Sequence, residues 1–119
     1  MVFIKFLNLV QVLVKDDECT YFLAASMAVG LRAAAKVQIA NLTITNCNME
    51  RLFGDVFRAN NIAKIIVKDT PIREIANDTF AGVGEYLKEF HLVNSRLKTF
   101  PVGAVQFLSV VTKIVIDRR

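Results

Sequence analysis

Apolar residues recur along the chain at a spacing that neither a regular strand nor a regular helix explains. In the stretch "LTITNCNMERL" (42–52), strict alternation covers only Leu42 and Ile44, and the next apolar residues of the pattern are Met49 and Leu52. Alternation indicates a strand, whereas a helix needs apolar residues three or four positions apart. The pattern therefore predicts a short strand that is followed directly by a turn.

The same pattern is repeated downstream. Aligning residues 39–49, 62–72 and 87–97 places apolar residues in four shared columns, and a fourth copy begins near residue 111. The columns contain Ile39, Ile62 and Leu87; Leu42, Ile65 and Phe90; Ile44, Val67 and Leu92; and Met49, Ile72 and Leu97. Repeats that start near 39, 62, 87 and 111 indicate an architecture in which each copy stacks on its neighbour.

Each repeat is predicted to consist of a strand, a turn and a return segment. Leu42 and Ile44 should point inward, because successive side chains of a strand point to opposite faces. Cys47, Thr70 and Ser95 share the column after the strand, where a small side chain can hydrogen-bond backbone groups that the turn leaves unpaired. We interpret Cys47 as a buried structural thiol; with Cys19 as the second cysteine, one disulfide or two free thiols are the alternatives.

The column spacing resembles the L-x-x-L-x-L-x-x-N/C-x-L core of leucine-rich repeats. It predicts an α/β fold, a short leucine-rich-repeat solenoid of three repeats plus a fourth strand. Residues 1–36 are predicted to form an apolar segment and a helical N-terminal cap over 16–36, and residues 37–119 the repeats. The return segments have helix-like content, with Asp78 or Thr79 as a candidate helix N-cap.

The residues of these repeats match one protein family more specifically than the generic leucine-rich-repeat pattern does. Cys47 and Thr70 in the turn column, "IREIANDTFAG" (72–82) and "LKTFPVGAV" (97–105) are similar to the arthropod extracellular leucine-rich repeat proteins. The resemblance covers residues 37–116. It implies a secreted or surface protein that binds partners and performs no chemistry itself.

The N-terminal segment allows two interpretations. Residues 2–14 are apolar apart from Lys5, Asn8 and Gln11, which is typical of a secretory signal. The charged run at 15–18 ends the segment with no small-residue cleavage site before it. We expect it to pack as part of the fold, with a cleaved signal as the alternative. The apolar run at 21–31 is too short to span a bilayer, so no transmembrane segment is predicted.

Composition and charge exclude several classes of function. The chain is 54% hydrophobic and carries a net charge of +4, which suits a folded domain with an acidic partner. The positive charges are scattered without interleaved aromatic residues, so nucleic-acid binding is not expected. His91 is the only histidine, and it has no second ligand at metal-binding spacing. Without a nucleophile–base pair or a phosphate loop, we predict no enzyme activity and no cofactor.

The outward positions of the strands form the candidate binding face. We predict that this concave face contacts a protein partner or a glycan, and a solvated face is the alternative. The candidate residues are Thr43, Thr45, Lys64, Ile66, Lys68, Glu89, His91, Val93, Lys113 and Val115, with Asn41 and Asp117 at the ends of the strip. His91 is expected to be an exposed strand residue.

The last strand provides a second candidate surface. Val111, Ile114 and Ile116 are predicted to form its inner side, and no return segment follows them in the sequence. An uncovered strand edge is a template for association. The leading prediction is a non-catalytic, extracellular protein-interaction module. The alternative is a structural or assembly subunit that self-associates through the uncovered ends. Asn41 and Asn77 lie in N-glycosylation sequons, which matter only in a secreted chain.

Overall fold

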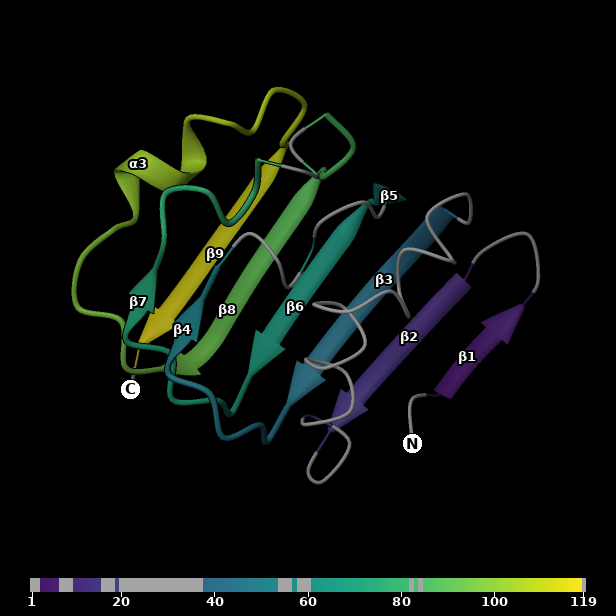
Figure 1. Cartoon of the computed structure of the whole chain (residues 1–119), viewed down its shortest axis with the longest axis horizontal. Helices are drawn as coiled ribbons and strands as arrows, with labels where there is room; N and C mark the ends of the chain where they lie inside the picture. The colour runs from purple at the N-terminus through teal and green to yellow at the C-terminus, as the bar shows by residue number, and fades with distance from the viewer. Residues whose placement is uncertain are drawn as a thin grey trace.

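One large sheet of mostly parallel strands forms the main layer of the molecule (Figure 1). The computed structural model of the chain describes residues 3–6, 10–15, 19, 38–53, 57, 61–81, 83 and 85–118. The strands follow the order β1-β2-β3-β6-β8-β9, and β5 pairs with the start of β3. The first pair, β1 and β2, is antiparallel, whereas β2, β3, β6, β8 and β9 run parallel. The strands of this sheet are β1 (Phe3–Phe6), β2 (Val10–Lys15), β3 (Gln38–Thr45), β5 (Asn61–Ile62), β6 (Lys64–Lys68), β8 (Glu89–Ser95) and β9 (Lys113–Arg118).

The strand register confirms two apolar columns of the sequence alignment. Leu42 lies beside Ile65, which lies beside Phe90, and Phe90 lies beside Ile114. Ile44, Val67, Leu92 and Ile116 form the second row in the same way. Burial alternates along β6 and β8, as expected for strands with one covered face.

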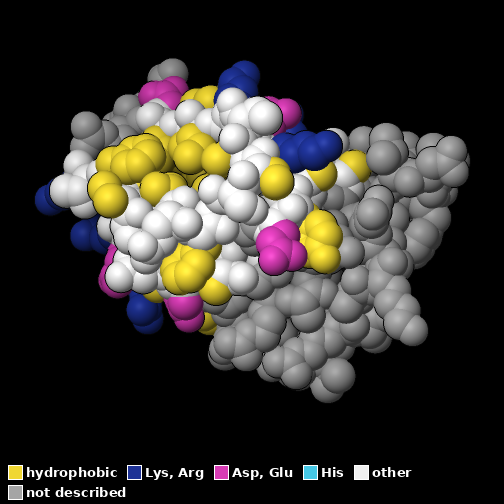
Figure 2. All heavy atoms as spheres, turned by 90° about the horizontal axis from the view of Figure 1, so that it is seen from above, with side chains coloured by type: hydrophobic (Ala, Val, Ile, Leu, Met, Phe, Trp, Pro, Cys, Tyr) yellow, Lys and Arg dark blue, Asp and Glu magenta, His cyan; other side chains and the backbone are white. Residues whose placement is uncertain are grey.

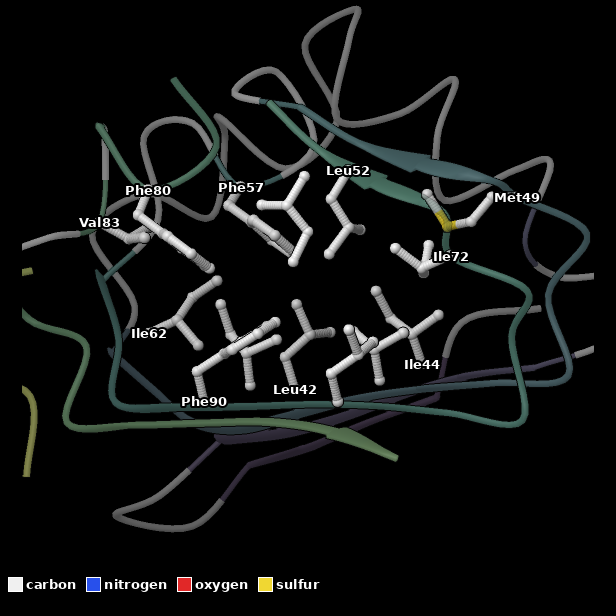
Figure 3. Packing of buried hydrophobic residues seen from close by; sticks show 14 of the residues in the cluster. Leu42, Ile44, Met49, Leu52, Phe57, Ile62, Ile72, Phe80, Val83 and Phe90 are labelled. Atoms are coloured by element: carbon white, nitrogen blue, oxygen red, sulfur yellow. The ribbon is translucent and has the colours of Figure 1, made fainter. Parts of the chain in front are cut away.

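A second layer of return segments covers the inner face of the sheet (Figure 1). Within this layer, β4 (Arg51–Leu52) and β7 (Glu74–Ile75) pair in parallel. Side chains of both layers meet in one core, with Leu52 and Phe80 from the returns above Leu42 and Phe90 from the sheet (Figure 3). The Phe80 ring stacks on Phe57 at a centroid distance of 6.5 Å and packs edge-on against Phe90 at 4.9 Å. The contact between Phe80 and Phe90 joins the two layers, whereas Phe57 and Phe80 both belong to the return layer.

The predicted fold class, an α/β leucine-rich-repeat solenoid, is wrong. Among the described residues, strands are the main regular structure and most of them belong to one largely parallel sheet, whereas α3 is a helix of only four residues, Val102–Val105. The predicted cap over 16–36 lies outside the described residues, apart from Cys19.

Local chemistry explains why the return segment after β7 is not a regular helix. Residues 77–81 around Thr79 form turns, and its buried hydroxyl shares its one proton between the Leu52 carbonyl at 3.0 Å and the Ala76 carbonyl at 2.6 Å. The sequence then carries Gly82 and Gly84, and each glycine disfavours a helix by about 1 kcal/mol relative to alanine.

Part of the apolar N-terminal segment belongs to the sheet. β2 lies parallel to β3, with Val12 beside Leu42 and Val14 beside Ile44, and Val14 is fully buried. The sheet therefore extends before residue 39, where the first predicted repeat begins. No helix among the described residues combines the length and the hydropathy needed to cross a membrane.

Candidate partner-binding face

The face of the large sheet that points away from the core, called the outer face below, brings the predicted binding residues together. Its residues are half-buried or exposed, and they alternate with fully buried neighbours along β3, β6 and β8. The predicted residues on it are Thr43, Thr45, Lys64, Ile66, Lys68, Glu89, His91, Val93, Lys113 and Val115. The parallel register places them in rows that cross the strands.

The middle row of the outer face combines three apolar residues with a threonine and a histidine. Leu13, Thr43, Ile66, His91 and Val115 lie side by side from β2 to β9. Leu13 is 37% exposed, and the three residues after it in the row are half-buried, as is Val115. Neighbouring strands are about 4.8 Å apart, so the row is about 19 Å long.

Charged residues flank the middle row on both sides. On one side Lys64, Glu89 and Lys113 lie in register. The row on the other side contains Lys15, Thr45, Lys68, Val93 and Asp117. The two flanking rows together contain four lysines and two carboxylates, so the outer face has a net positive charge.

Glu89 is the electrostatic centre of its row. Nε2 of His91 lies 3.0 Å from Oε1 of Glu89, and Nζ of Lys64 lies 3.9 Å from the same oxygen. The hydrogen bond with His91 lowers the pKa of Glu89, and the positive charges of Lys64 and Lys113 lower it further, against the opposing effect of desolvation. Glu89 therefore stays ionised at neutral pH. It also fixes the His91 ring, which is 16% exposed and thus less exposed than the sequence predicted.

β2 contributes two residues to the outer face that are not among those predicted from the sequence, Leu13 and Lys15. Both are exposed and lie beside Thr43 and Thr45. The available signal was the pair Val12 and Val14, which has the same two-residue spacing as Leu42 and Ile44. The continuous apolar run at 2–14 concealed it.

The turn column after the strands has the predicted structural role, with one correction. The Cys47 amide donates to Oγ1 of Thr70 at 3.3 Å, and that hydroxyl donates to the Lys68 carbonyl at 3.0 Å. In the next repeat, the Leu97 amide donates to Oγ of Ser95 at 3.4 Å. The interpretation of Cys47 as a free buried thiol is wrong, because Cys47 forms a disulfide with Cys19.

An open groove of about 550 Å³ lies at the carboxyl ends of β3, β6 and β8. Asn46, Asp69 and Asn94 line it, and each has a left-handed backbone, with φ of 55°, 52° and 58°. Asparagine and aspartate tolerate this conformation better than most residues. Nδ2 of Asn94 donates to Oδ1 of Asp69 at 2.8 Å. These side chains support consecutive turns, so a structural role accounts for the groove.

The other candidate residues are more dispersed. Ile114 and Ile116 pack partly against the core from β9, and Val111 lies half-buried in the loop before it. Asn77 is exposed in a turn of the return layer, whereas Asn41 is half-buried in β3. Among the described residues, no three His, Cys, Asp or Glu side chains are grouped so that they could hold a metal ion.

No protein-family model matches the chain, and neither the curated proteins nor the solved structures searched contain a match. The resemblance to arthropod extracellular leucine-rich repeat proteins therefore stays a prediction from the sequence.

Proposed function

We propose that this chain is a non-catalytic protein-interaction module that binds its partner through the outer face. The observation that carries the proposal is the middle row from Leu13 to Val115, in which three of the five residues are apolar and which has lysines on both sides. A row of this kind offers apolar contact at its centre and charge at its rim, which is the usual anatomy of a protein interface.

The charge of the outer face favours an acidic partner surface. Lys15 and Lys68 on one side, and Lys64 and Lys113 on the other, outnumber Glu89 and Asp117. Such an arrangement accelerates encounter with a negatively charged partner and makes binding sensitive to salt. The partner segment we expect is apolar in its centre and carries Asp or Glu on both sides.

The size of the outer face sets the expected strength of binding. The rows span about 19 Å across the strands, and the three rows cover about 13 Å along them, which gives a footprint of about 250 Å². A standard interface buries about 800 Å² on each partner. A partner that contacts the outer face alone should therefore bind weakly and transiently.

The experiment compares two charge-reversed forms of the protein. Lys64→Glu with Lys68→Glu changes the outer face, and Arg51→Glu with Arg73→Glu makes the same change in net charge on the return layer, where both arginines are exposed. Each form and the wild type serve as bait for proteins from the source organism. Dissociation constants of a captured, purified protein are then measured at low and high salt.

We expect the outer-face variant to weaken binding at least tenfold and to reduce its salt dependence, while the return-layer variant binds like the wild type. If the wild type and the outer-face variant bind the partner equally well, the outer face is not the binding site.

A second candidate function is that of an assembly subunit that self-associates through the edge of the sheet. The specific observation in its favour is that Ile114 and Ile116 of β9 are only partly buried, whereas their counterparts in β6 and β8 are fully buried.

A further inference from the structure

The β9 edge leaves part of the apolar core uncovered. In the row Leu42, Ile65, Phe90 and Ile114, the first three residues are at most 1% exposed, but Ile114 is half-buried. The second inner row shows the same change at its last residue, Ile116. Within the described part of the chain, β8 is the strand that pairs with β9, so the other side of β9 presents unpaired backbone groups.

The segment that leads into β9 exposes further apolar side chains. Phe100 is 55% exposed, Val102 70%, Phe107 45% and Val110 41%. Figure 2 shows hydrophobic side chains gathered on the face seen from above, where α3 and the loop before β9 lie in Figure 1. The segment before β9 in the sequence is therefore itself rich in exposed apolar side chains.

The sequence of β9 is complementary to itself when it is reversed. Residues 113–117 read Lys-Ile-Val-Ile-Asp, with a cation at one end, an anion at the other, and Val115 in the centre. Two copies of this strand placed antiparallel about Val115 bring Lys113 of each opposite Asp117 of the other. Asp117 is exposed, and its neighbour in the β8–β9 ladder is the uncharged Val93.

Only one antiparallel register pairs both charges and also places the cores of the two copies on the same side of the joined sheet. Directly opposed residues point to the same face of a sheet, so the two-fold axis must pass through a residue for both cores to lie on one side. An axis at Ile114 pairs Lys113 with Val115, and an axis at Ile116 pairs Asp117 with Val115. The axis at Val115 alone pairs both charges and places Ile114 opposite Ile116.

We propose that β9 pairs antiparallel with β9 of a second copy, with the two-fold axis at Val115. This proposal rests on the second candidate function and specifies its contact. The two sheets become one continuous sheet, and each Ile114 is covered by the other copy's Ile116. Because the contact is isologous, it closes at a dimer and leaves no further β9 edge free.

The test uses charge reversal at the two ends of β9, measured by light scattering after size exclusion over a wide range of concentrations. Lys113→Asp alone places Asp opposite Asp twice, and Asp117→Lys alone places Lys opposite Lys twice. The double variant K113D/D117K restores both opposite-charge pairs. An equimolar mixture of the two single variants restores them as well, in a heterodimer. Arg73→Asp, on the return layer, is the matched control.

We expect the wild type, the double variant and the control to dimerise alike. Each single variant alone should show a dimer dissociation constant roughly tenfold higher, because two repulsive contacts replace two attractive ones. Mixing the single variants should restore dimerisation. Circular dichroism of every variant establishes that loss of the dimer is not loss of the fold.

Two results would overturn the proposal, and each contradicts a different part of it. If the wild type stays monomeric at all concentrations, both the proposed register and the self-association function are wrong. If the single charge reversals do not weaken the dimer, or if neither the double variant nor the mixture restores it, only the proposed register is wrong. In neither case is binding through the outer face affected, since its own test changes Lys64 and Lys68.

Discussion

The disulfide between Cys19 and Cys47 gives the most quantitative prediction about stability. Both residues are buried, and they are separated by 28 positions, so the bond links the chain just after β2 to the turn after β3. Closing a loop of this length lowers the entropy of the unfolded chain. At 25 °C, the chain-entropy model gives about 3.5 kcal/mol of stabilisation.

The perturbation is the double variant Cys19→Ala/Cys47→Ala. A domain of this size has a total stability of roughly 5–15 kcal/mol, so the loss of about 3.5 kcal/mol should be a large shift in the urea midpoint. The backbone amide of Cys47 keeps its bond to Thr70 in the variant, because that bond does not involve the sulfur. The measured loss should therefore come mainly from the missing cross-link.

The assay is reversible urea unfolding followed by circular dichroism, with the wild type measured oxidised and after reduction. The reduced wild type and the alanine variant should unfold at similar urea concentrations, both well below the oxidised wild type. In hydrogen exchange, β2 and β3 should lose more protection than β8, because the bond lies at their end of the sheet. A loss below about 1 kcal/mol, or two titratable thiols in the native protein, would refute the reasoning.

Three further substitutions test the core and the outer face. Thr79→Val removes the buried hydroxyl that bonds the Leu52 and Ala76 carbonyls. Each carbonyl keeps a backbone amide donor, so the loss should cost about 0.5–1.5 kcal/mol, measured by urea unfolding with Thr79→Ser as the hydroxyl-preserving control. Phe80→Ala removes the ring that joins the two layers and should cost about 3–5 kcal/mol in the same assay; a cost near zero would contradict the observed packing. Because the folded-state pKa of Glu89 is lowered from 4.5, its ionised form stabilises the fold above pH 4.5, and this contribution is lost as the pH falls through the lowered value. Glu89→Gln should therefore unfold at lower urea than the wild type at pH 6, with the difference shrinking as the pH falls below 4.5, and a difference that does not change with pH would refute this account.

The repeat columns could be predicted from the sequence because they reflect a local, periodic requirement. A strand with one covered face needs alternating apolar residues, and stacked strands need them at equal positions. Leu42, Ile65 and Phe90 satisfy both conditions, and the register places them side by side. The same alternation predicts which residues share the outer face, and the register places those from β3 to β9 side by side.

The features that the sequence did not reveal depend on competition between local signals or on distant contacts. Val12 and Val14 belong to a continuous apolar run, which hides the alternation that marks β2. Thr79 has the chemistry of a helix cap, but its hydroxyl bonds to the neighbouring return segment, which no local pattern encodes. The bond between Cys19 and Cys47 depends on the pairing of β2 with β3, which sequence spacing alone does not give.

The two proposals share Lys113, Val115 and Asp117 of β9 but use different features of the sheet, and they are compatible. Binding through the outer face uses exposed side chains. Pairing at the β9 edge uses backbone groups together with the partly buried core residues Ile114 and Ile116. Pairing of two β9 strands would join two outer faces into one surface. A dimer could then engage two copies of a partner segment, or a longer one, which would compensate for the small footprint of a single face.

The most direct test of the central claim is nuclear magnetic resonance of the isotope-labelled chain during titration with the captured partner. Our account predicts that amide shifts change in the middle row, at Thr43, Ile66, His91 and Val115, and stay constant in the return layer at Arg51 and Glu74. Shift changes confined to the return layer, with the middle row unaffected, would contradict it.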